Sequence, residues 1–238
     1  MNPKRHELKP DEQLIRKSQK GYQILEKTFG LPEWRQPLSA LDELVSTILS
    51  QNTTDVNRDV AFTRLKKKFP NWETVREAPE EEVVEAIRPA GLANQKAPRI
   101  QAILHQITEE RGDLTLDFLS EMGRQGAHDW LSRFKGVGPK TAAIVLQFSL
   151  GIPAFPVDTH VYRVSGRLGL RPEKMGVENA HAWLEQLFAP EQYGPGHLNF
   201  IRLGREICHT CKPECPRCPL NGLCDYFQNL QKPVNCPA

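Results

Sequence analysis

Residues 134–142 read FKGVGPKTA and lie between two segments with helical hydrophobic spacing. Gly136 and Gly138 permit a tight backbone turn, and Pro139 suits the first turn of a following helix, where its missing N–H leaves no hydrogen bond unmade. The free N–H groups at such a helix start form an anion site that a phosphate can approach closely. The stretch predicts two helices joined by a phosphate-binding hairpin; a plain turn between packed helices is the alternative.

The same helical spacing continues along most of the chain. A regular i, i+3, i+4, i+7, i+8 stripe is formed by Leu41, Leu44, Val45, Ile48 and Leu49. Strict alternation long enough for a sheet is not found, so the sequence predicts an all-α protein. The predicted helices cover residues 14–29, 41–49, 56–69, 81–87, 96–110, 127–134, 139–150, 159–168, 177–188 and 197–208, with joints that include the Gly-Pro-Gly at 194–196.

Composition places the chain among globular proteins. It has 238 residues, of which 39% are hydrophobic and 25% charged, which excludes disordered and collagen-like classes. No uninterrupted apolar stretch reaches the roughly 18 residues that span a bilayer, and no signal peptide opens the chain. We therefore expect no membrane partner and a reducing, cytoplasmic compartment.

Charge is distributed unevenly. The 31 Lys and Arg against 29 Asp and Glu leave a net charge of +2, which by itself indicates no partner. Residues 124–174, however, carry eight basic and three acidic side chains, whereas residues 71–88 carry six Glu and two Arg. One part of the molecule could attract phosphate, although a solvated charged face is the plainer interpretation.

All six cysteines lie after residue 207, and five of them fall within residues 208–224. Such clustering favours metal ligation over ordinary buried thiols, and the compartment disfavours disulfides, although a single redox pair remains possible. The two Cys-x2-Cys pairs are three residues apart, where zinc sites usually have about a dozen or more. The spacing therefore favours an iron–sulfur cluster over zinc. The ligand set that suits a [4Fe–4S] cluster is Cys208, Cys215, Cys218 and Cys224.

Two charged residues are candidates for chemistry. Lys140 falls in the first turn of the helix after the hairpin, at the positive end of the dipole, where an acidic residue would be the better local choice. Partial burial there would favour the neutral amine, a nucleophile that can attack a sugar carbon and form a Schiff base; a surface lysine that touches phosphate is the alternative. Asp158 precedes a predicted helix, and its ordinary role would be that of an N-cap.

The cysteine intervals x6, x2 and x5 and the stretch 134–142 resemble the cluster loop and the helix-hairpin-helix of the endonuclease III family of DNA repair glycosylases. The likeness extends from about residue 14 to residue 224. It implies that Lys140 is the nucleophile of an enzyme that both releases a base and cleaves the strand. It also implies that Asp158, in VDTH at 157–160, assists departure of the base by stabilising positive charge on the sugar or by activating the lysine.

This chain departs from the family pattern at several positions. Lys135 stands where a proline is common, and Ser132 stands where some members carry a carboxylate. Cys211 and Cys236 are extra to the ligand pattern, and Cys211 could substitute for Cys208.

An enzyme that acts on a base inside a duplex must flip the base out and fill the gap. The segment SQNTTD at 50–55 resembles the family segment with the gap-filling amide; Asn52 holds the family's glutamine position and follows Gln51. Either amide could contact the unpaired base, and without the other motifs both would be turn residues. Leu92 resembles the family's wedge leucine, although a core leucine is the default interpretation. The other DNA contacts that the resemblance implies are Gly136, Gly138, Lys212 and Arg217.

The resemblance implies two helical domains with DNA crossing the cleft between them. A six-helix domain covers residues 33–152, and a cluster domain combines residues 1–32 and 153–238. The implied protein is a monomeric, cytoplasmic and nucleoid-associated glycosylase and AP lyase. Its partner would be double-stranded DNA that contains damaged pyrimidines or abasic sites, and it would excise oxidised pyrimidines.

Two alternatives remain open at this point. A monofunctional mismatch glycosylase that removes adenine would use a glutamate where this chain has Thr47 and Ile48, and would generally lack the hairpin lysine. A non-catalytic DNA-binding protein would use the hairpin to hold phosphates and the metal to hold the loop.

Overall fold

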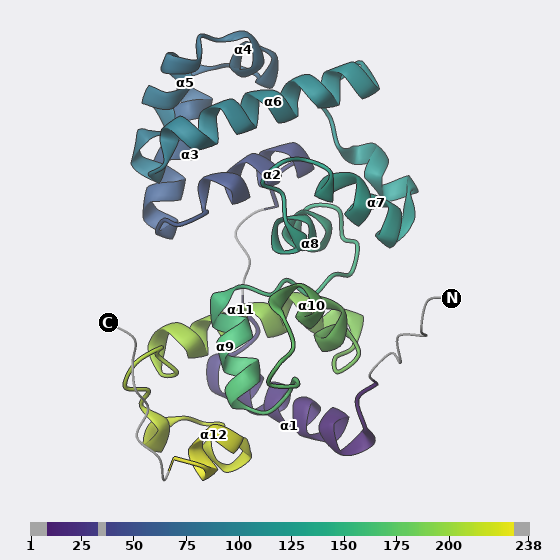
Figure 1. The fold of residues 1–238 in the computed structure, drawn as a ribbon, viewed down its shortest axis with the longest axis vertical. Coiled ribbons are helices and arrows are strands. Elements are labelled where there is room, and N and C mark those ends of the chain that lie inside the picture. Colours follow the sequence, from purple (N-terminus) through teal and green to yellow (C-terminus); the bar gives the residue numbers. More distant parts are fainter. Residues whose placement is uncertain (1–8, 33–36, 231–238) are drawn as a thin grey trace. The chain divides into compact units, whose positions relative to one another are not determined.

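The computed structural model describes residues 9–32 and 37–230. Within them all regular elements are α-helices or short 3-10 helices, and no strand occurs, which confirms the all-α prediction. The chain divides into two compact units: Gln36–Ile152, and Met1–Arg35 together with Pro153–Ala238 (Figure 1). Each unit is described by itself. None of the described helices is long and apolar enough to cross a membrane.

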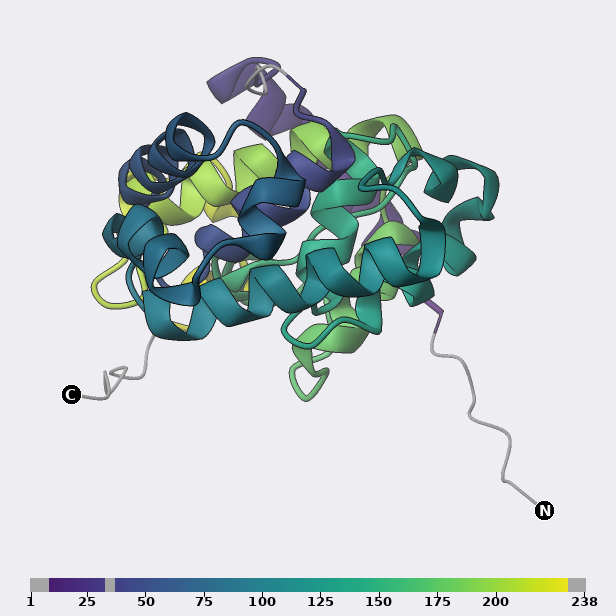
Figure 2. The same cartoon turned by 90° about the horizontal axis from the view of Figure 1, so that it is seen from above.

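The unit Gln36–Ile152 is built around one buried helix. Its elements are α2 (Ala40–Leu49), α3 (Asp55–Lys68), α4 (Trp72–Glu77), α5 (Glu80–Ile87), η1 (Arg88–Ala90), α6 (Ala93–Arg111), η2 (Asp117–Glu121), α7 (Gly123–Ser132) and α8 (Pro139–Phe148). All but one residue of α2 is buried, and α2 packs against α8, α3 and α6. The view from above shows the long α6 in teal (Figure 2). A helix that is buried on nearly every side forms the core against which the others pack.

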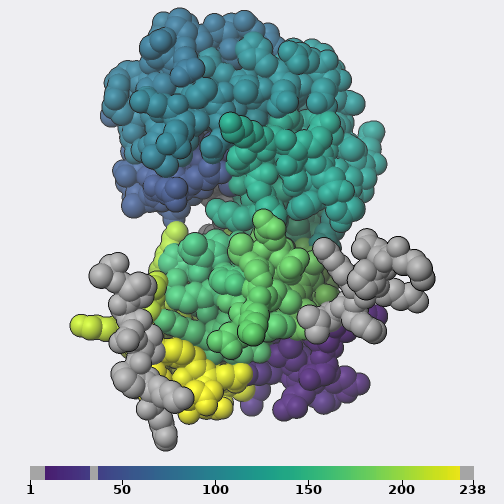
Figure 3. Space-filling model, in the orientation of Figure 1, coloured from purple at the N-terminus to yellow at the C-terminus, as the bar shows by residue number. Residues whose placement is uncertain are grey.

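The second unit joins the two halves of the chain. Its elements are α1 (Glu12–Phe29), α9 (Thr159–Arg167), α10 (Val177–Glu185), η3 (Pro190–Gln192), α11 (Tyr193–Glu206), η4 (Cys215–Arg217), η5 (Asn221–Leu223) and α12 (Asp225–Gln228). The outer atoms of α1 (purple) and of the C-terminal loop (yellow) are seen in the space-filling view (Figure 3). The core of this unit includes Phe155, whose ring stacks 5.3 Å from that of Phe188. Polar contacts fasten α1, since Ser18 Oγ and Gln19 Nε2 both donate to the carbonyl of Leu187, at 3.0 and 2.8 Å.

The structure corrects two details of the predicted helices. The Gly-Pro-Gly at 194–196 is not a joint, because it lies in the first turn of α11. Pro195 is tolerated there since the first N–H groups of a helix have no intrahelical partner, and a Cβ on Gly196 would lie 3.4 Å from the ring of Phe155. The short helices α4 and α12 were not predicted. Asn71 caps α4 through the N–H of Thr74 at 2.9 Å, and α4 packs against α6.

Candidate functional site

The hairpin between α7 and α8 has two buried apolar residues and two exposed glycines. Phe134 and Val137 are buried, whereas Gly136 and Gly138 are exposed. Gly136 has a φ of +86°, and a Cβ there would lie 2.4 Å from Nε of Arg99. Gly138 is the N-cap of α8, which begins at Pro139 without a side-chain cap. The first N–H groups of α8 are thus uncovered by a capping side chain, an arrangement that favours an anion.

Lys140 is the second residue of α8 and is partly buried. The residues that follow it anchor the helix in the core: Thr141, Ala142, Ala143, Ile144, Val145 and Leu146 are all buried. Its position at the helix start is the one that the sequence predicts.

Left-handed backbone marks three of the predicted DNA contacts. Among the described residues other than glycine, a positive φ occurs at Asn52 (53°), Leu92 (51°) and Lys212 (51°). Such a conformation costs on the order of 1–3 kcal/mol and persists only where the surroundings impose it. Asn52 is exposed, and Leu92 is 47% exposed, so Leu92 is not a core leucine.

The two amides of the segment 50–55 differ in their contacts. Gln51 Nε2 donates to the carbonyl of Gly136 at 3.0 Å, and Gln51 Oε1 accepts from Nη1 of Arg99 at 2.9 Å. The side chain of Gln51 therefore connects α6 to the hairpin within this unit. Neither contact was predicted from the sequence.

Lys96 of α6 is a functional candidate that sequence reasoning missed. It is 1% exposed, and its Nζ donates to the carbonyls of Leu49 at 2.7 Å and Ala90 at 2.8 Å. Burial, with a smaller contribution from the charge of Arg99, lowers the pKa of Lys96 to about 8. A signal was present in the periodicity, because Lys96 occupies an apolar position of a buried stripe. The buried residues of α6 are Ala93, Lys96, Ala97, Ile100, Ile103, Leu104 and Ile107.

Asp158 lies in the second unit, at the start of α9. Its Oδ1 accepts from the N–H of Val161 at 2.8 Å, so it is the N-cap of that helix. It is partly buried, as is His160, which lies 3.1 Å from Nη2 of Arg163 through Nδ1. Burial lowers the pKa of His160, which makes a structural role through its neutral ring the simplest one. The cap holds the Asp158 carboxylate in a fixed direction.

Four cysteines of the C-terminal loop meet at one pocket. Cys208, Cys215, Cys218 and Cys224 line it together. Cys211 is not among its lining residues, and Cys236 lies outside the described residues. The other lining residues are Arg167, Ile207, Pro213, Asn221, Tyr226 and Phe227. Burial raises the pKa of the Cys218 thiol to about 11 and also raises the pKa of the Cys215 and Cys224 thiols.

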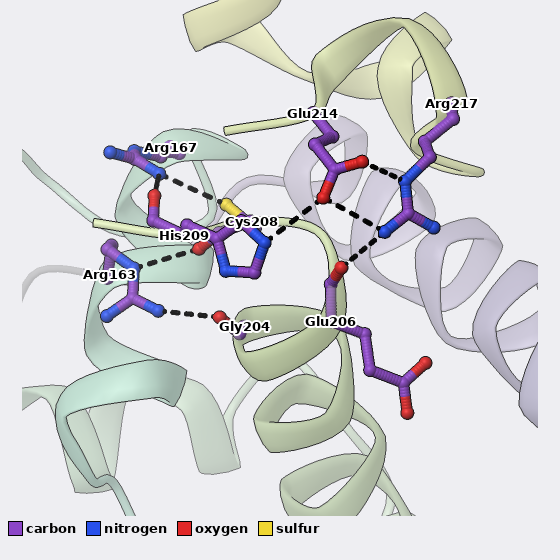
Figure 4. A network of polar contacts seen from close by, with 8 residues as sticks. All are labelled: Arg163, Arg167, Gly204, Glu206, Cys208, His209, Glu214 and Arg217. Atoms are coloured by element: carbon purple, nitrogen blue, oxygen red, sulfur yellow. Dashed lines mark hydrogen bonds and ion pairs between the residues drawn. The ribbon is translucent and has the colours of Figure 1, made fainter. Parts of the chain in front are cut away.

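Arginines of α9 hold the start of this loop. Arg167 Nη1 donates to Sγ of Cys208 at 3.4 Å and to the carbonyl of His209 at 2.5 Å. Arg163 Nε donates to the carbonyl of Cys208 at 3.0 Å, and Arg163 Nη2 to that of Gly204 at 2.9 Å (Figure 4). Arg167 is therefore a cation in direct contact with one thiol of the pocket.

Arg217 also donates hydrogen bonds that stabilise this loop. Its Nε donates to Oε2 of Glu214 at 2.5 Å, and its Nη2 donates to the carbonyl of Glu206 at 2.5 Å. Hydrogen bonds from Arg217 and then His209 lower the pKa of Glu214 to about 2. The guanidinium predicted to touch DNA phosphate is thus engaged within the loop, as Figure 4 shows.

Comparison with known proteins identifies the family of the chain. The family model described as "HhH-GPD superfamily base excision DNA repair protein" matches residues 45–190. Endonuclease III of Thermotoga maritima is 34% identical over 189 residues, which cover 79% of this chain and 84% of that protein. Endonuclease III of Rickettsia conorii is 35% identical over 193 residues, covering 79% and 85%.

A solved structure agrees as well. The structure of a non-covalent endonuclease III–DNA complex superposes with a TM-score of 0.74 and 30% identity, covering 89% of this chain and 96% of that one. The chain therefore belongs to the HhH-GPD superfamily of base excision DNA repair proteins and, within it, to the endonuclease III family of DNA glycosylases.

Proposed function

We propose that this protein is a bifunctional DNA glycosylase and AP lyase that excises oxidised pyrimidines from duplex DNA. The observation that carries the proposal is the place of Lys140, partly buried in the first turn of α8 directly after an uncapped hairpin. A phosphate bound by the hairpin N–H groups would bring a nucleotide close to this amine. We further propose that the protein acts as a monomer, in the cytoplasm and on the nucleoid.

The proposed reaction begins with the neutral Nζ of Lys140, which attacks C1′ of a flipped nucleotide. The bond between C1′ and the base breaks, and its electron pair leaves with the base, which takes up a proton. Transfer of an amine proton to the ring oxygen opens the sugar and leaves a protonated imine between Nζ and C1′. β-Elimination then removes a proton from C2′, breaks the C3′–O bond and nicks the strand 3′ to the lesion, and water hydrolyses the imine.

Asp158 would act on the first step. The carboxylate is oriented by its cap on α9, and its negative charge would stabilise the positive charge that develops on the sugar as the base leaves. Alternatively, it would accept a proton from the attacking amine. Both roles are compatible with capping, because the cap uses one oxygen atom.

We also infer that Cys208, Cys215, Cys218 and Cys224 hold a [4Fe–4S] cluster. The four thiols line one pocket, and Arg167 lies against the first of them, so the donor set and its charge fit an all-cysteine cluster. Among the described residues, no group of three or more His, Cys, Asp or Glu side chains is already placed to hold a metal ion, so the inference rests on the shared pocket and the spacing of the four thiols. Four thiolate bonds would cross-link the loop, and we expect this structural role.

Borohydride trapping tests the lyase mechanism. Reduction during turnover on a thymine glycol duplex should join the protein covalently to DNA, and Lys140→Gln should abolish the adduct. The matched control is Lys135→Gln, which removes an exposed lysine of the same hairpin and should leave the adduct in place. An adduct that persists in Lys140→Gln would contradict the assignment of the nucleophile.

A lesion panel tests the reaction class. Oxidised pyrimidines, mismatches and abasic sites in duplex oligonucleotides are scored separately for base release and for strand nicking. Release and nicking of oxidised pyrimidines is the expected result. Release without nicking would identify a monofunctional glycosylase, and binding without release of any base would identify a non-catalytic DNA-binding protein.

A further inference from the structure

Two basic residues of α6, Lys96 and Arg99, lie about one turn apart. Both donate hydrogen bonds to other segments of the same unit. Lys96 is buried and donates to the last carbonyl of α2, on Leu49, and to the last carbonyl of η1, on Ala90. These carbonyls precede the two turns that contain Asn52 and Leu92, the residues with left-handed backbone. The ammonium group of Lys96 therefore connects the chain segments that lead into both turns that are predicted to insert into DNA.

Arg99 completes this arrangement on the side of the hairpin. Its guanidinium donates to Gln51 Oε1 at 2.9 Å, and Gln51 Nε2 donates to the carbonyl of Gly136 at 3.0 Å. The same guanidinium fills the space that a side chain at Gly136 would occupy. Contacts of this kind link α6, the segment 50–55 and the hairpin into one hydrogen-bonded chain.

The side-chain amides of Gln51 and Asn52 therefore differ in their contacts within the protein. Gln51 uses both ends of its amide inside the protein, and one of these bonds is to a charged group. If Gln51 moved into DNA, it would break both bonds and leave the guanidinium of Arg99 without this acceptor. Asn52 is exposed at the tip of the turn, and asparagine is among the few residues that tolerate the left-handed region.

We propose that Lys96, Arg99 and Gln51 form a clamp that fixes the two DNA-inserting turns to the hairpin, and that Gln51 is a positioning residue while Asn52 is the amide that contacts the unpaired base. The inference rests on the proposed glycosylase function, since it assigns roles within the same site. The sequence leaves either amide able to contact the unpaired base, and the two hydrogen bonds of Gln51 separate them.

The identity of the opposite base distinguishes a contact from a positioning role. Single-turnover base release is measured with thymine glycol opposite A, G, C and T in turn. Gln51→Ala should slow release by a similar factor for all four, on the order of 10-fold for a lost positioning hydrogen bond. Asn52→Ala should change the ranking of the four opposite bases. A changed ranking in Gln51→Ala with a uniform loss in Asn52→Ala would overturn the assignment.

A second measurement tests the clamp without DNA. Thermal unfolding is compared for the wild type, Gln51→Ala, Arg99→Met and the double variant, because residues in contact give non-additive effects. The double variant should lower Tm by no more than the larger single change. Gln106→Ala, an exposed glutamine of α6, should instead be additive with Arg99→Met. Additive loss for Gln51 and Arg99 would overturn the clamp.

The base-release and unfolding measurements test the proposed function and the clamp independently. If the wild type released no base from any duplex, the proposed function would be wrong, while the unfolding cycle would still decide whether the clamp exists. If the wild type is active and the cycle is additive, the function stands and the clamp is wrong. Lys96→Met serves as a supporting variant, expected to slow release opposite every base alike.

Discussion

The guanidinium of Arg99 occupies the space that a side chain on Gly136 would need, since a Cβ there would lie 2.4 Å from Nε of Arg99. Gly136 also has a φ of +86°, which side chains rarely adopt. The backbone conformation therefore requires glycine at this position, and a side chain there would also displace the guanidinium of Arg99.

This relationship predicts different outcomes for the two glycines of the hairpin. Gly136→Ala should lower the free energy of unfolding by about 1–3 kcal/mol, because alanine is strained at this positive φ and would also displace the guanidinium that is bound to Gln51. Gly138→Ala should change it by no more than about 0.5 kcal/mol, since its φ is −93° and no atom lies within 4 Å of a Cβ there. Urea unfolding measures both.

Gly138→Ala, which should leave stability almost unchanged, should nevertheless weaken DNA binding. Its added methyl group would face the approaching phosphate, so Gly138→Ala should weaken binding to an undamaged duplex while the protein remains as stable as the wild type. Unchanged affinity in Gly138→Ala would argue against phosphate binding at the start of α8.

The choice of cluster ligands leads to a test with two cysteines. Cys208→Ser should remove the iron–sulfur absorbance of the purified protein, because Cys208 lines the pocket. Cys211→Ser should retain it, since Cys211 is not among the lining residues. Iron, zinc and acid-labile sulfide are quantified for both variants. Zinc without sulfide in the wild type, or loss of the cluster in Cys211→Ser alone, would refute the ligand assignment.

Lys96 should make stability depend on pH in a defined direction. Its pKa is about 8 in the folded protein, below the value of 10.5 for a free lysine. Between these values the unfolded chain binds more protons, so the free energy of unfolding should rise with pH from about 8 to 10.5, and the stabilisation is smallest below pH 8. Lys96→Met should lack this rise, whereas Lys67→Met, at an exposed position of α3, should keep it. Parallel pH profiles for all three proteins would contradict the low pKa.

Leu92 allows strain to be separated from function. Leu92→Ala and Leu92→Gly both remove the exposed side chain, but only glycine relieves the left-handed backbone at φ 51°. Leu92→Gly should therefore be more stable than Leu92→Ala by about 1–2 kcal/mol. Both should slow base release to a similar extent, because the wedge is absent from each. Release at the wild-type rate in both variants would show that Leu92 is not a wedge.

Much of the fold could be predicted because helices depend on local patterns. The stripe of α2, the start of α8 at Pro139 and the cap at Asp158 all follow from residues within a few positions of one another. The short α4 escaped prediction because a six-residue helix has too few turns to show a period. The turn at 194–196 was misplaced because glycine and proline also fit the first turn of a helix.

The sequence by itself determined the helical class, the hairpin with its lysine and the family of the protein, since each of these depends on short spacings that the chain displays directly. Only the tertiary structure decided which cysteines share a pocket, which amide is bound inside the protein and why Lys96 is buried. The physical reason is distance along the chain. Gln51 and Gly136 are 85 residues apart, and Lys96 and Leu49 are 47 apart, so their hydrogen bonds form only when packing around α2 brings α6, the segment 50–55 and the hairpin together.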